Sequence, residues 1–558
     1  MSKKRLRFSQ SVYDLLVVGG GIQGVWIAWD AVLRGLSVAL VEKGDFGHAT
    51  SSSTLRIIHG GLRYLQHGDL RRMRQCMFER MILMQLAPHL VQPLPFLIPT
   101  YYHGLRSKWI LRLALLASEL LGKGVERERA DGAGKVFPPG RILSKDECRR
   151  LLPGVIQEGL TGAVVYSEAQ VSNSERLLLS VLNSAIKKGA DAANYLEGIR
   201  LLRREDRIVG VTARDVLTGD ELDLRGRIVV NVTGPWVDRV LDRIDDSPPR
   251  RKHGLSKAFN LLVDRSPISA YALGLYSATP LKDPDELLNR GGRLLFITPW
   301  QNHAFLGTAH LLSGDDPDAL EVTEEEIQAF ITEFNVAYPP FCLTRGEVRV
   351  VYGGLLPAAE SESSRLRLLK HYQIQDHHSD HGPDGLISVR TVKYSEARHV
   401  AEKVVDLVFR KLGKAAPKSV TAVTPIHGGA VGRLEAFVSQ ETQNPRTPLG
   451  LEAIRHLIAQ YGSAYVEVLK YVEERPHPGQ DMDAPLSALK AEVRYGVREQ
   501  MAQKLTDVVF RRTALGMSGN PTDHALSACA DVMAGELGWS EERKQEEIRE
   551  TKANLLFR

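Results

Sequence analysis

The chain has 558 residues, more than one hydrophobic core usually supports, so the sequence predicts at least two domains. Its hydrophobic content of 43% and charged content of 25% are typical of a globular protein and exclude a disordered or fibrous chain. The 72 basic and 67 acidic residues leave a net charge of +5, which is too small an excess to indicate a nucleic-acid partner.

Neither of two apolar segments predicts export or a membrane span. The stretch after the basic residues 1–10 contains Asp14 and a glycine cluster, which is untypical of a signal peptide. Residues 109–121 carry Arg112 and Glu119 and are shorter than the roughly 20 residues of a spanning helix. We therefore expect a cytoplasmic protein and leave open peripheral association with the inner face of the cytoplasmic membrane. The four widely spaced cysteines indicate neither a redox pair nor a metal site.

The first element in chain order is typical of a dinucleotide site. Residues 13–18 (YDLLVV) are apolar and rich in β-formers, as expected of a buried parallel strand. They lead into GGGIQG, in which Gly19, Gly21 and Gly24 have the GxGxxG spacing. These glycines permit a tight turn, close approach of the backbone to a pyrophosphate, and close packing of a helix. Residues 23–33 predict that helix, with its N-terminus facing the phosphates.

A second apolar strand, residues 37–41, ends in Glu42. A carboxylate at this point can accept hydrogen bonds from ribose hydroxyls, and it disfavours a 2′-phosphate. A glycine cluster alone would indicate only a turn. Strand, glycines, helix, strand and acid in this order predict a Rossmann-like site, without separating NAD from FAD.

The residues that follow narrow the choice of cofactor. Residues 42–65 (EKGDFGHATSSSTLRIIHGGLRYL) closely resemble the corresponding stretch of the FAD-dependent glycerol-3-phosphate dehydrogenases. The similarity continues in residues 87–99, 228–238 and 491–513 and so covers nearly the whole chain. This family belongs to the glutathione-reductase and D-amino-acid-oxidase-like flavoproteins, and the resemblance implies FAD as the cofactor.

The resemblance also implies an α/β fold: a Rossmann-like FAD-binding domain with an interleaved α+β substrate domain, and an all-α C-terminal domain. The oxidoreductase domain would span residues 1–410 and the C-terminal domain residues 411–558. The segments expected to form the FAD-binding part are 11–80, 150–250 and 385–410, with the substrate cap mainly in 251–384. In the C-terminal domain, apolar residues recur at helical spacing from Val493 to Val508, which predicts a helix there.

Several segments offer groups to the cofactor. Thr50, Ser51 and Ser52 supply hydroxyl and backbone donors where a pyrophosphate and flavin would pass, although a plain polar loop is the alternative. Gly60 and Gly61 leave space for the isoalloxazine ring, and a simple turn explains them equally well. The FAD contacts that the fingerprint and the resemblance together imply are Gly19, Gly21, Gly24, Glu42, Lys43, Thr50, Ser51, Ser52, Gly60, Gly61, Leu62, Thr233, Gly234, Trp236 and Lys393.

The implied reaction oxidises glycerol 3-phosphate to dihydroxyacetone phosphate, with hydride transfer to the flavin and electrons passed to a quinone-type acceptor. A base must remove the hydroxyl proton, and cations must bind the phosphate. Arg63 can fork onto the phosphate, Tyr64 can donate a hydrogen bond, and Lys393 matches a family lysine near flavin and substrate. His59 and His310 are candidate proton carriers. Each of these five residues also has a structural interpretation.

The substrate half departs from the family pattern and indicates a diverged pocket. Leu356 stands where the family typically has an arginine, and a neutral leucine cannot bind phosphate. Thr391 and Val392 replace paired glycines, and Asn260 occupies a position where a histidine is common. Arg390 is a candidate replacement cation. Two alternatives therefore stay open: a related oxidoreductase acting on another hydroxy or amino compound, and a flavoprotein without turnover. The acceptor, the catalytic base and a homodimer also stay open.

Overall fold

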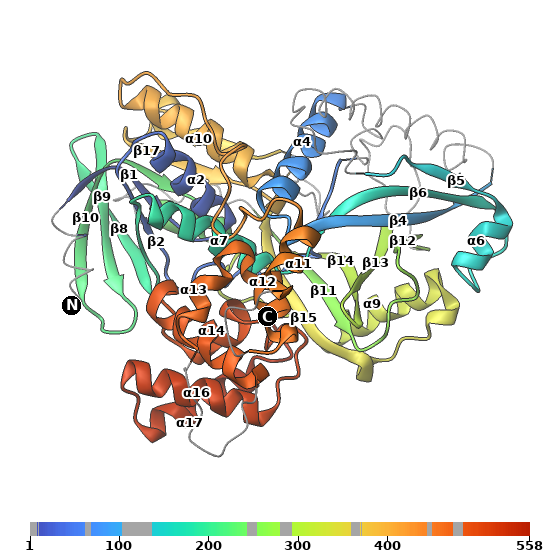
Figure 1. Ribbon diagram of the computed structural model, residues 1–558. Coiled ribbons are helices and arrows are strands. Elements are labelled where there is room, and N and C mark those ends of the chain that lie inside the picture. Colours follow the sequence, from blue (N-terminus) through green and yellow to red (C-terminus); the bar gives the residue numbers. More distant parts are fainter. Residues whose placement is uncertain are drawn as a thin grey trace, which may run out of the picture.

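The structure is a computed structural model that describes residues 8, 11–61, 69–102, 137–242, 254–278, 293–358, 369, 371–443, 449–472 and 484–558. Two β-sheets stand side by side, and a group of helices from the C-terminal part of the chain packs beneath them (Figure 1). The expected α/β class is confirmed. Leu62, Arg63, Tyr64 and the apolar segment 109–121 lie outside the described residues.

Sheet A has a parallel centre in the order β17-β10-β1-β2-β7, with β16 antiparallel at one edge. A hairpin of β8 and β9 continues antiparallel from β10. The strands of this sheet are β1 (Val12–Val18), β2 (Val38–Val41), β7 (Asp191–Ala193), β8 (Leu196–Arg204), β9 (Arg207–Asp215), β10 (Glu221–Asn231), β16 (Gln373–Asp376) and β17 (Leu386–Arg390).

Apolar layers cover both faces of the parallel strands, which explains why β1 and β2 are continuously apolar. One face packs against α2 (Ile22–Leu33), α7 (Ser174–Lys187) and α10 (Ala397–Lys411). The other face packs against the β8–β9 hairpin. This layering fixes the carboxyl ends of β1, β10 and β17 at one edge of the sheet, where α2 begins.

Sheet B is mostly antiparallel, in the order β15-β11-β14-β13-β12-β4-β6-β3, with β5 paired to β6. Its strands are β3 (Ile57–Ile58), β4 (Val91–Tyr101), β5 (Arg141–Leu143), β6 (Leu160–Val171), β11 (Leu255–Val263), β12 (Ala272–Tyr276), β13 (Leu294–Trp300), β14 (His303–Ser313) and β15 (Val348–Pro357). Helices α6 (Lys145–Leu151) and α9 (Glu324–Ala337) share one core with this sheet. Helix α4 (Leu70–Leu86) lies between the two sheets (Figure 1).

The C-terminal part is helical, as expected, but one helix is shorter than its periodicity predicts. Its helices are α11 (Leu434–Gln443), α12 (Leu451–Tyr461), α13 (Tyr465–Leu469), α14 (Ala484–Gln500), α15 (Leu505–Asp507), α16 (Asp523–Leu537) and α17 (Glu541–Ala553). The prediction of a helix through Val508 is wrong, because α14 ends at Gln500 and Met501 has a positive φ of 57°. Side chains from elsewhere bind the Gln500 and Met501 carbonyls and so satisfy them without a helix.

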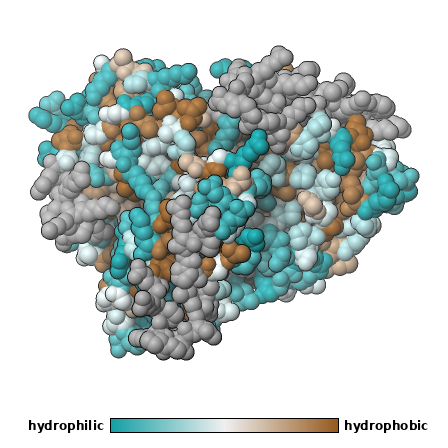
Figure 2. Space-filling model, in the orientation of Figure 1, coloured by the Kyte–Doolittle hydropathy of each residue, from teal (hydrophilic) through white to brown (hydrophobic). Residues whose placement is uncertain are grey.

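Hydrophilic and apolar residues are interspersed over the face drawn in Figure 2. None of the helices within the described ranges combines the length and the apolar character that crossing a membrane requires.

Candidate active site

Loops that follow β1, β10 and β17 lie together at the carboxyl edge of sheet A. The Gly19 N–H donates to the Val41 carbonyl at 2.8 Å, which joins the glycine loop to the end of β2. Gln23 Nε2 donates to the Lys393 carbonyl at 3.3 Å, which adds the loop after β17. Ligands of open α/β sheets bind at such an edge. The structure therefore gathers the glycine loop, Glu42 and Lys393, which are far apart in the sequence.

The glycines of the fingerprint are required by close contacts. Gly19 has a φ of 116°, and a Cβ there would lie 2.6 Å from the Val232 carbonyl oxygen. A Cβ at Gly24 would lie 1.9 Å from the Gly19 oxygen. Gly21 caps the N-terminus of α2 without any side-chain bond. The first turn of α2 thus leaves backbone N–H groups for an anion, which a pyrophosphate would satisfy.

Glu42 is buried and holds the glycine loop. One carboxylate oxygen accepts from the Gly20 N–H at 2.7 Å, and the other accepts from the Gly44 N–H at 2.9 Å. Each oxygen keeps a further lone pair for a ribose hydroxyl. The acid predicted from the sequence is therefore placed beside the phosphate-binding turn, as a ribose contact requires.

Lys43 and Trp236 meet, although 193 positions separate them in the chain. Lys43 Nζ lies 3.7 Å from the Trp236 ring centroid, and both side chains donate to Asp318, at 3.0 and 2.6 Å. Burial alone would raise the pKa of Asp318, but these hydrogen bonds and the charges of Lys43 and Arg239 hold it below its usual value. Asp318 was not expected from the sequence, because it lies in the loop after β14 and belongs to no motif.

The three hydroxyl residues after β2 have different partners. Thr50 Oγ1 donates to the Leu355 carbonyl at 2.8 Å, and Ser52 Oγ donates to the Ala49 carbonyl at 2.8 Å. Ser51 Oγ instead accepts from the Ile22 N–H at 3.0 Å, at the start of α2. Of the three, Ser51 is therefore the one whose hydroxyl hydrogen is left for a ligand at the N-terminus of α2.

Gly60 is packed against an ion pair. Its N–H donates to the carboxylate of Glu168, which also binds Arg80. A Cβ at Gly60 would lie 2.5 Å from the Arg80 guanidinium, so a larger residue would have to displace this side chain from Glu168. The close approach of Arg80 therefore accounts for glycine at position 60. Gly61 has a left-handed φ of 83°, which favours glycine there.

One face of sheet B is directed toward the loop after β2, which carries Thr50. Cross-strand neighbours share a face, and His310, Ala258 and Gly354 form one such row across β14, β11 and β15. A Cβ at Gly354 would lie 3.2 Å from the Thr50 backbone, so this face lies against the Thr50 loop. Leu356 has the same parity along β15 as Gly354 and is on this face too.

Asn260 ties the same face of sheet B to the loop. Its Nδ2 donates to the Ser53 carbonyl at 3.2 Å, and its Oδ1 accepts from Thr308 Oγ1 at 2.8 Å. His59 is exposed near the Phe96 and Phe296 rings, at centroid distances of 6.4 and 6.1 Å. The two candidate histidines are thus in different surroundings, since His310 is half-buried.

Two cations, one at the end of β17 and one in the loop after it, already interact with carboxylates. Lys393 is half-buried, and its Nζ lies 3.3 Å from Glu396 Oε1, which also accepts from Arg72 at 3.2 Å. Arg390 is buried and donates to Asp238 and Gln375. Arg390 is therefore a weaker candidate for substrate phosphate than Lys393. Thr391 and Val392, between these cations, are both half-buried.

Gln23 provides a test of whether a ligand fits this edge. Its Oε1 is buried at the start of α2, and no described residue donates to it. A buried amide oxygen normally has a hydrogen-bond donor, so this position is suited to a donor group on a bound molecule. Within the described ranges, no group of three or more histidine, cysteine or acidic side chains is arranged to hold a metal ion.

A glycine-rich turn at a parallel sheet and an acid after β2 form a dinucleotide-binding edge, and the comparisons with known proteins identify the class as the FAD-dependent oxidoreductases. The family model of FAD-dependent oxidoreductases matches residues 14–384. A second model, the C-terminal domain of alpha-glycerophosphate oxidase, matches residues 419–544.

Individual relatives narrow this class. The chain is 33% identical to a glycerol-3-phosphate dehydrogenase of Synechocystis sp., covering 97% of this chain and 95% of the relative. It is 30% identical to the glycerol-3-phosphate dehydrogenase of Mycobacterium leprae, covering 97% and 88%. The structure of the glycerol-3-phosphate dehydrogenase from Bacillus halodurans complexed with FAD matches with a TM-score of 0.76 at 25% identity, covering 99% of this chain and 97% of that chain. The chain therefore belongs to the glycerol-3-phosphate dehydrogenase family, and its cofactor is FAD.

Proposed function

We propose that the protein oxidises glycerol 3-phosphate to dihydroxyacetone phosphate. The observation that carries this proposal is the similarity to a glycerol-3-phosphate dehydrogenase over 97% of the chain. The face of sheet B that lies against the Thr50 loop supports it, because a proton carrier, His310, belongs to that face. Bound FAD supplies the acceptor for the two electrons that leave the alcohol carbon.

The remaining steps belong to the protein. The phosphate needs a cation, and we assign Lys393 to it together with Arg63, which lies outside the described residues. The alcohol needs a base, and we assign His310, because it is half-buried on the face that lies against the Thr50 loop. His59 is the alternative base.

Water must be excluded while the proton and hydride leave. Two contacts hold sheet B against the loop after β2: Thr50 Oγ1 to the Leu355 carbonyl, and Asn260 Nδ2 to the Ser53 carbonyl. These bonds fix the distance between the two halves of the site without using any charged group. We infer that they orient the substrate carbon relative to the cofactor.

We propose a quinone-type compound as the electron acceptor. The proposal extends to a cytoplasmic protein that associates peripherally with the inner face of the membrane, and to a homodimer. These assignments follow the family resemblance of the sequence. Reduction of a soluble quinone analogue, compared with oxygen consumption under the same conditions, tests the acceptor. Sedimentation with liposomes and the mass in solution test the other two.

Anaerobic mixing with substrate tests the proposed reaction. We expect millimolar glycerol 3-phosphate to bleach the visible flavin absorbance, and glycerol, which lacks the phosphate, to have little effect at the same concentration. Absence of bleaching by glycerol 3-phosphate would overturn the proposal. Leu356 favours one alternative, because a neutral side chain stands on the substrate-facing side of sheet B. A panel of uncharged alcohols and amines tests that alternative by the same readout.

A further inference from the structure

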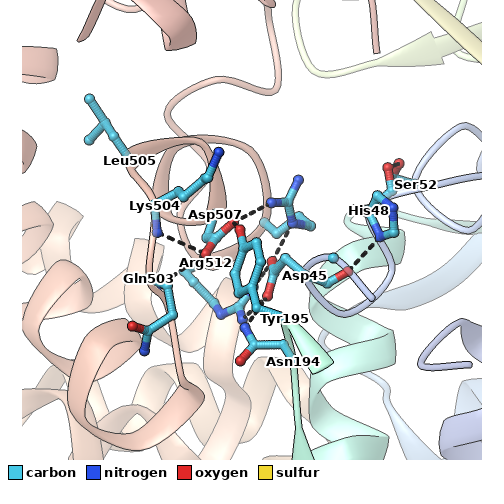
Figure 3. A network of polar contacts seen from close by, with 12 residues as sticks. Asp45, His48, Ser52, Asn194, Tyr195, Gln503, Lys504, Leu505, Asp507 and Arg512 are labelled. Carbon is cyan, nitrogen blue, oxygen red and sulfur yellow. Dashed lines mark hydrogen bonds and ion pairs between the residues drawn. The ribbon is translucent and has the colours of Figure 1, made fainter. Parts of the chain in front are cut away.

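Arg512 of the C-terminal part binds Asp45, which lies in the loop after β2 (Figure 3). The adjacent Arg511 binds the same carboxylate. Arg511 and Arg512 end the π-helical segment Val508–Arg512. Arg512 forms a two-pronged contact with Asp45, with Nη1 to Oδ2 at 2.6 Å and Nη2 to Oδ1 at 2.7 Å. Arg511 Nε donates to the same Oδ2. All three side chains are buried.

The arginines are themselves held in place. Arg511 Nη2 donates to Asp507 Oδ1 at 2.7 Å, and Asp507 Oδ2 accepts from the Gln503 and Lys504 N–H groups at 2.8 and 3.0 Å. Arg512 Nη2 donates to the carbonyl of Gln500, at the end of α14, at 2.8 Å. The break between α14 and α15 therefore provides the backbone groups that orient both guanidinium groups.

Asp45 also forms hydrogen bonds with Asn194 and His48, which lie outside the C-terminal part. The Asn194 amide donates to Asp45 Oδ1 at 2.9 Å and to the Met501 carbonyl at 2.8 Å, so it bridges the two parts of the molecule. The Asp45 carbonyl accepts from the N–H and the Nδ1 of His48, at 3.1 and 2.8 Å. Burial raises the pKa of Asp45, but both arginines outweigh it, so the pKa lies well below its usual value.

This network lies in the segment between two of the predicted cofactor contacts, Glu42 and Ser51. Asp45 lies three positions after Glu42 and six before Ser51 in the sequence. Within the same loop, the Gly47 N–H donates to the Gly20 carbonyl at 3.1 Å, and Glu42 accepts from the Gly20 N–H. A shift of the loop at Asp45 would therefore move Glu42 and the glycine turn together.

Buried charge pairs are poor sources of stability, because the loss of hydration offsets much of their attraction. They are better suited to fixing one geometry, since a displaced partner leaves an uncompensated buried charge. This network contains four buried ionisable side chains, Asp45, Asp507, Arg511 and Arg512, and Tyr195 donates to Asp507 at 2.7 Å. Because burying them costs hydration free energy, stability alone does not explain the network. The network lies in the loop that carries Glu42, so we relate its fixed geometry to cofactor binding.

We propose that Arg511 and Arg512 are positioning residues for FAD. By holding Asp45, they preorganise the loop that carries Glu42 and Ser51, so that the C-terminal domain sets the affinity for the cofactor. A loop that is not held spends part of its time in conformations that cannot bind, which raises the apparent dissociation constant in proportion. The inference concerns FAD binding and is independent of which substrate is oxidised.

Titration of the apoprotein with FAD, followed by flavin fluorescence, tests the proposal. We expect Arg512→Gln to raise the FAD dissociation constant about tenfold or more, since a charged contact is lost. Arg512→Lys keeps the charge without the two-pronged geometry, so its constant should fall between those of the wild type and Arg512→Gln. Asp45→Asn should match Arg512→Gln, and combining the two should add little, because both break the same contact.

Tyr465→Phe is the matched control. It removes a buried hydrogen bond to Glu441 within the C-terminal helices and leaves Arg511, Arg512 and Asp45 untouched. We expect an unchanged dissociation constant. The proposal is overturned if Tyr465→Phe weakens FAD as much as Arg512→Gln, or if folded Arg512→Gln and Asp45→Asn bind FAD like the wild type. If Arg512→Gln does not fold, Asp45→Asn, which keeps the side-chain shape, decides alone.

Discussion

Sheet A and sheet B build the two halves of the site by different means. At the edge of sheet A the determining groups are largely backbone: N–H groups at the start of α2, glycines without room for a Cβ, and carbonyls that fix the turns. On sheet B the groups that we propose to face the substrate are side chains on three adjacent strands, such as His310 on β14 and Leu356 on β15. Backbone geometry tolerates few substitutions, whereas side chains on a sheet face can change singly.

This difference fits the resemblance noted in the sequence, which departs from the family pattern at two positions of sheet B, Asn260 and Leu356. A change at Gly24 must move the backbone of Gly19, because the two positions are in contact. A change at Leu356 alters charge and shape on one face while the hydrogen bonds of β15 remain. A substitution on this face of sheet B therefore leaves the backbone in place, whereas a substitution in the glycine turn displaces it.

The largest effect is expected for Gly24→Ala. The added Cβ would lie 1.9 Å from the Gly19 oxygen, so α2 must move away from β1, at a cost of about 3 kcal/mol, typical of overpacking. We expect the purified protein to lose most of its flavin absorbance relative to protein absorbance. Gly535→Ala in α16, where nothing lies within 4 Å of the added Cβ, should keep full flavin content and gain about 1 kcal/mol of stability. Normal flavin content in Gly24→Ala would contradict the backbone role.

A smaller effect separates the two candidate histidines, His310 and His59. We expect His310→Gln to lower kcat at least about 100-fold, as loss of a general base does, with the flavin content unchanged. His59→Gln should lower kcat less than about tenfold, because this side chain is exposed beside Phe96 and Phe296. Steady-state assays with glycerol 3-phosphate and an artificial electron acceptor measure kcat for both variants. The reverse ranking would assign the proton transfer to His59.

Local patterns predicted β1, the glycine turn, α2, β2 and Glu42, because these groups lie within 30 positions of one another. The periodicity of apolar residues and the spacing of Gly19, Gly21, Gly24 and Glu42 follow from chemistry that a short segment contains. The Asp45 contact was not predicted, because its partner Arg512 is 467 positions away and no spacing in the sequence pairs the two residues. Asp318 was missed for the same reason.

The broken helix after Gln500 shows a second limit. Apolar residues continue at helical spacing past that point, so a pattern of burial alone predicts a longer helix. The chain leaves the helix because Arg512 and Asn194 bind the carbonyls of Gln500 and Met501. Periodicity reports which face is buried, whereas the end of a helix depends on which groups satisfy its terminal carbonyls.

The smallest effect, and the sharpest test of the substrate face, is a gain of function. Leu356→Arg places a cation on the side of β15 that bears Gly354, which lies against Thr50. If the phosphate binds on this face, KM for glycerol 3-phosphate should fall about tenfold, the lower range for a charge-assisted contact, with kcat little changed. Leu356→Met, of similar volume and no charge, should leave KM unchanged. An unchanged KM in a folded, flavin-loaded Leu356→Arg variant would mean that the phosphate is bound elsewhere, by Lys393 and residues of the FAD side. The face of sheet B would then recognise the carbon skeleton rather than the charge.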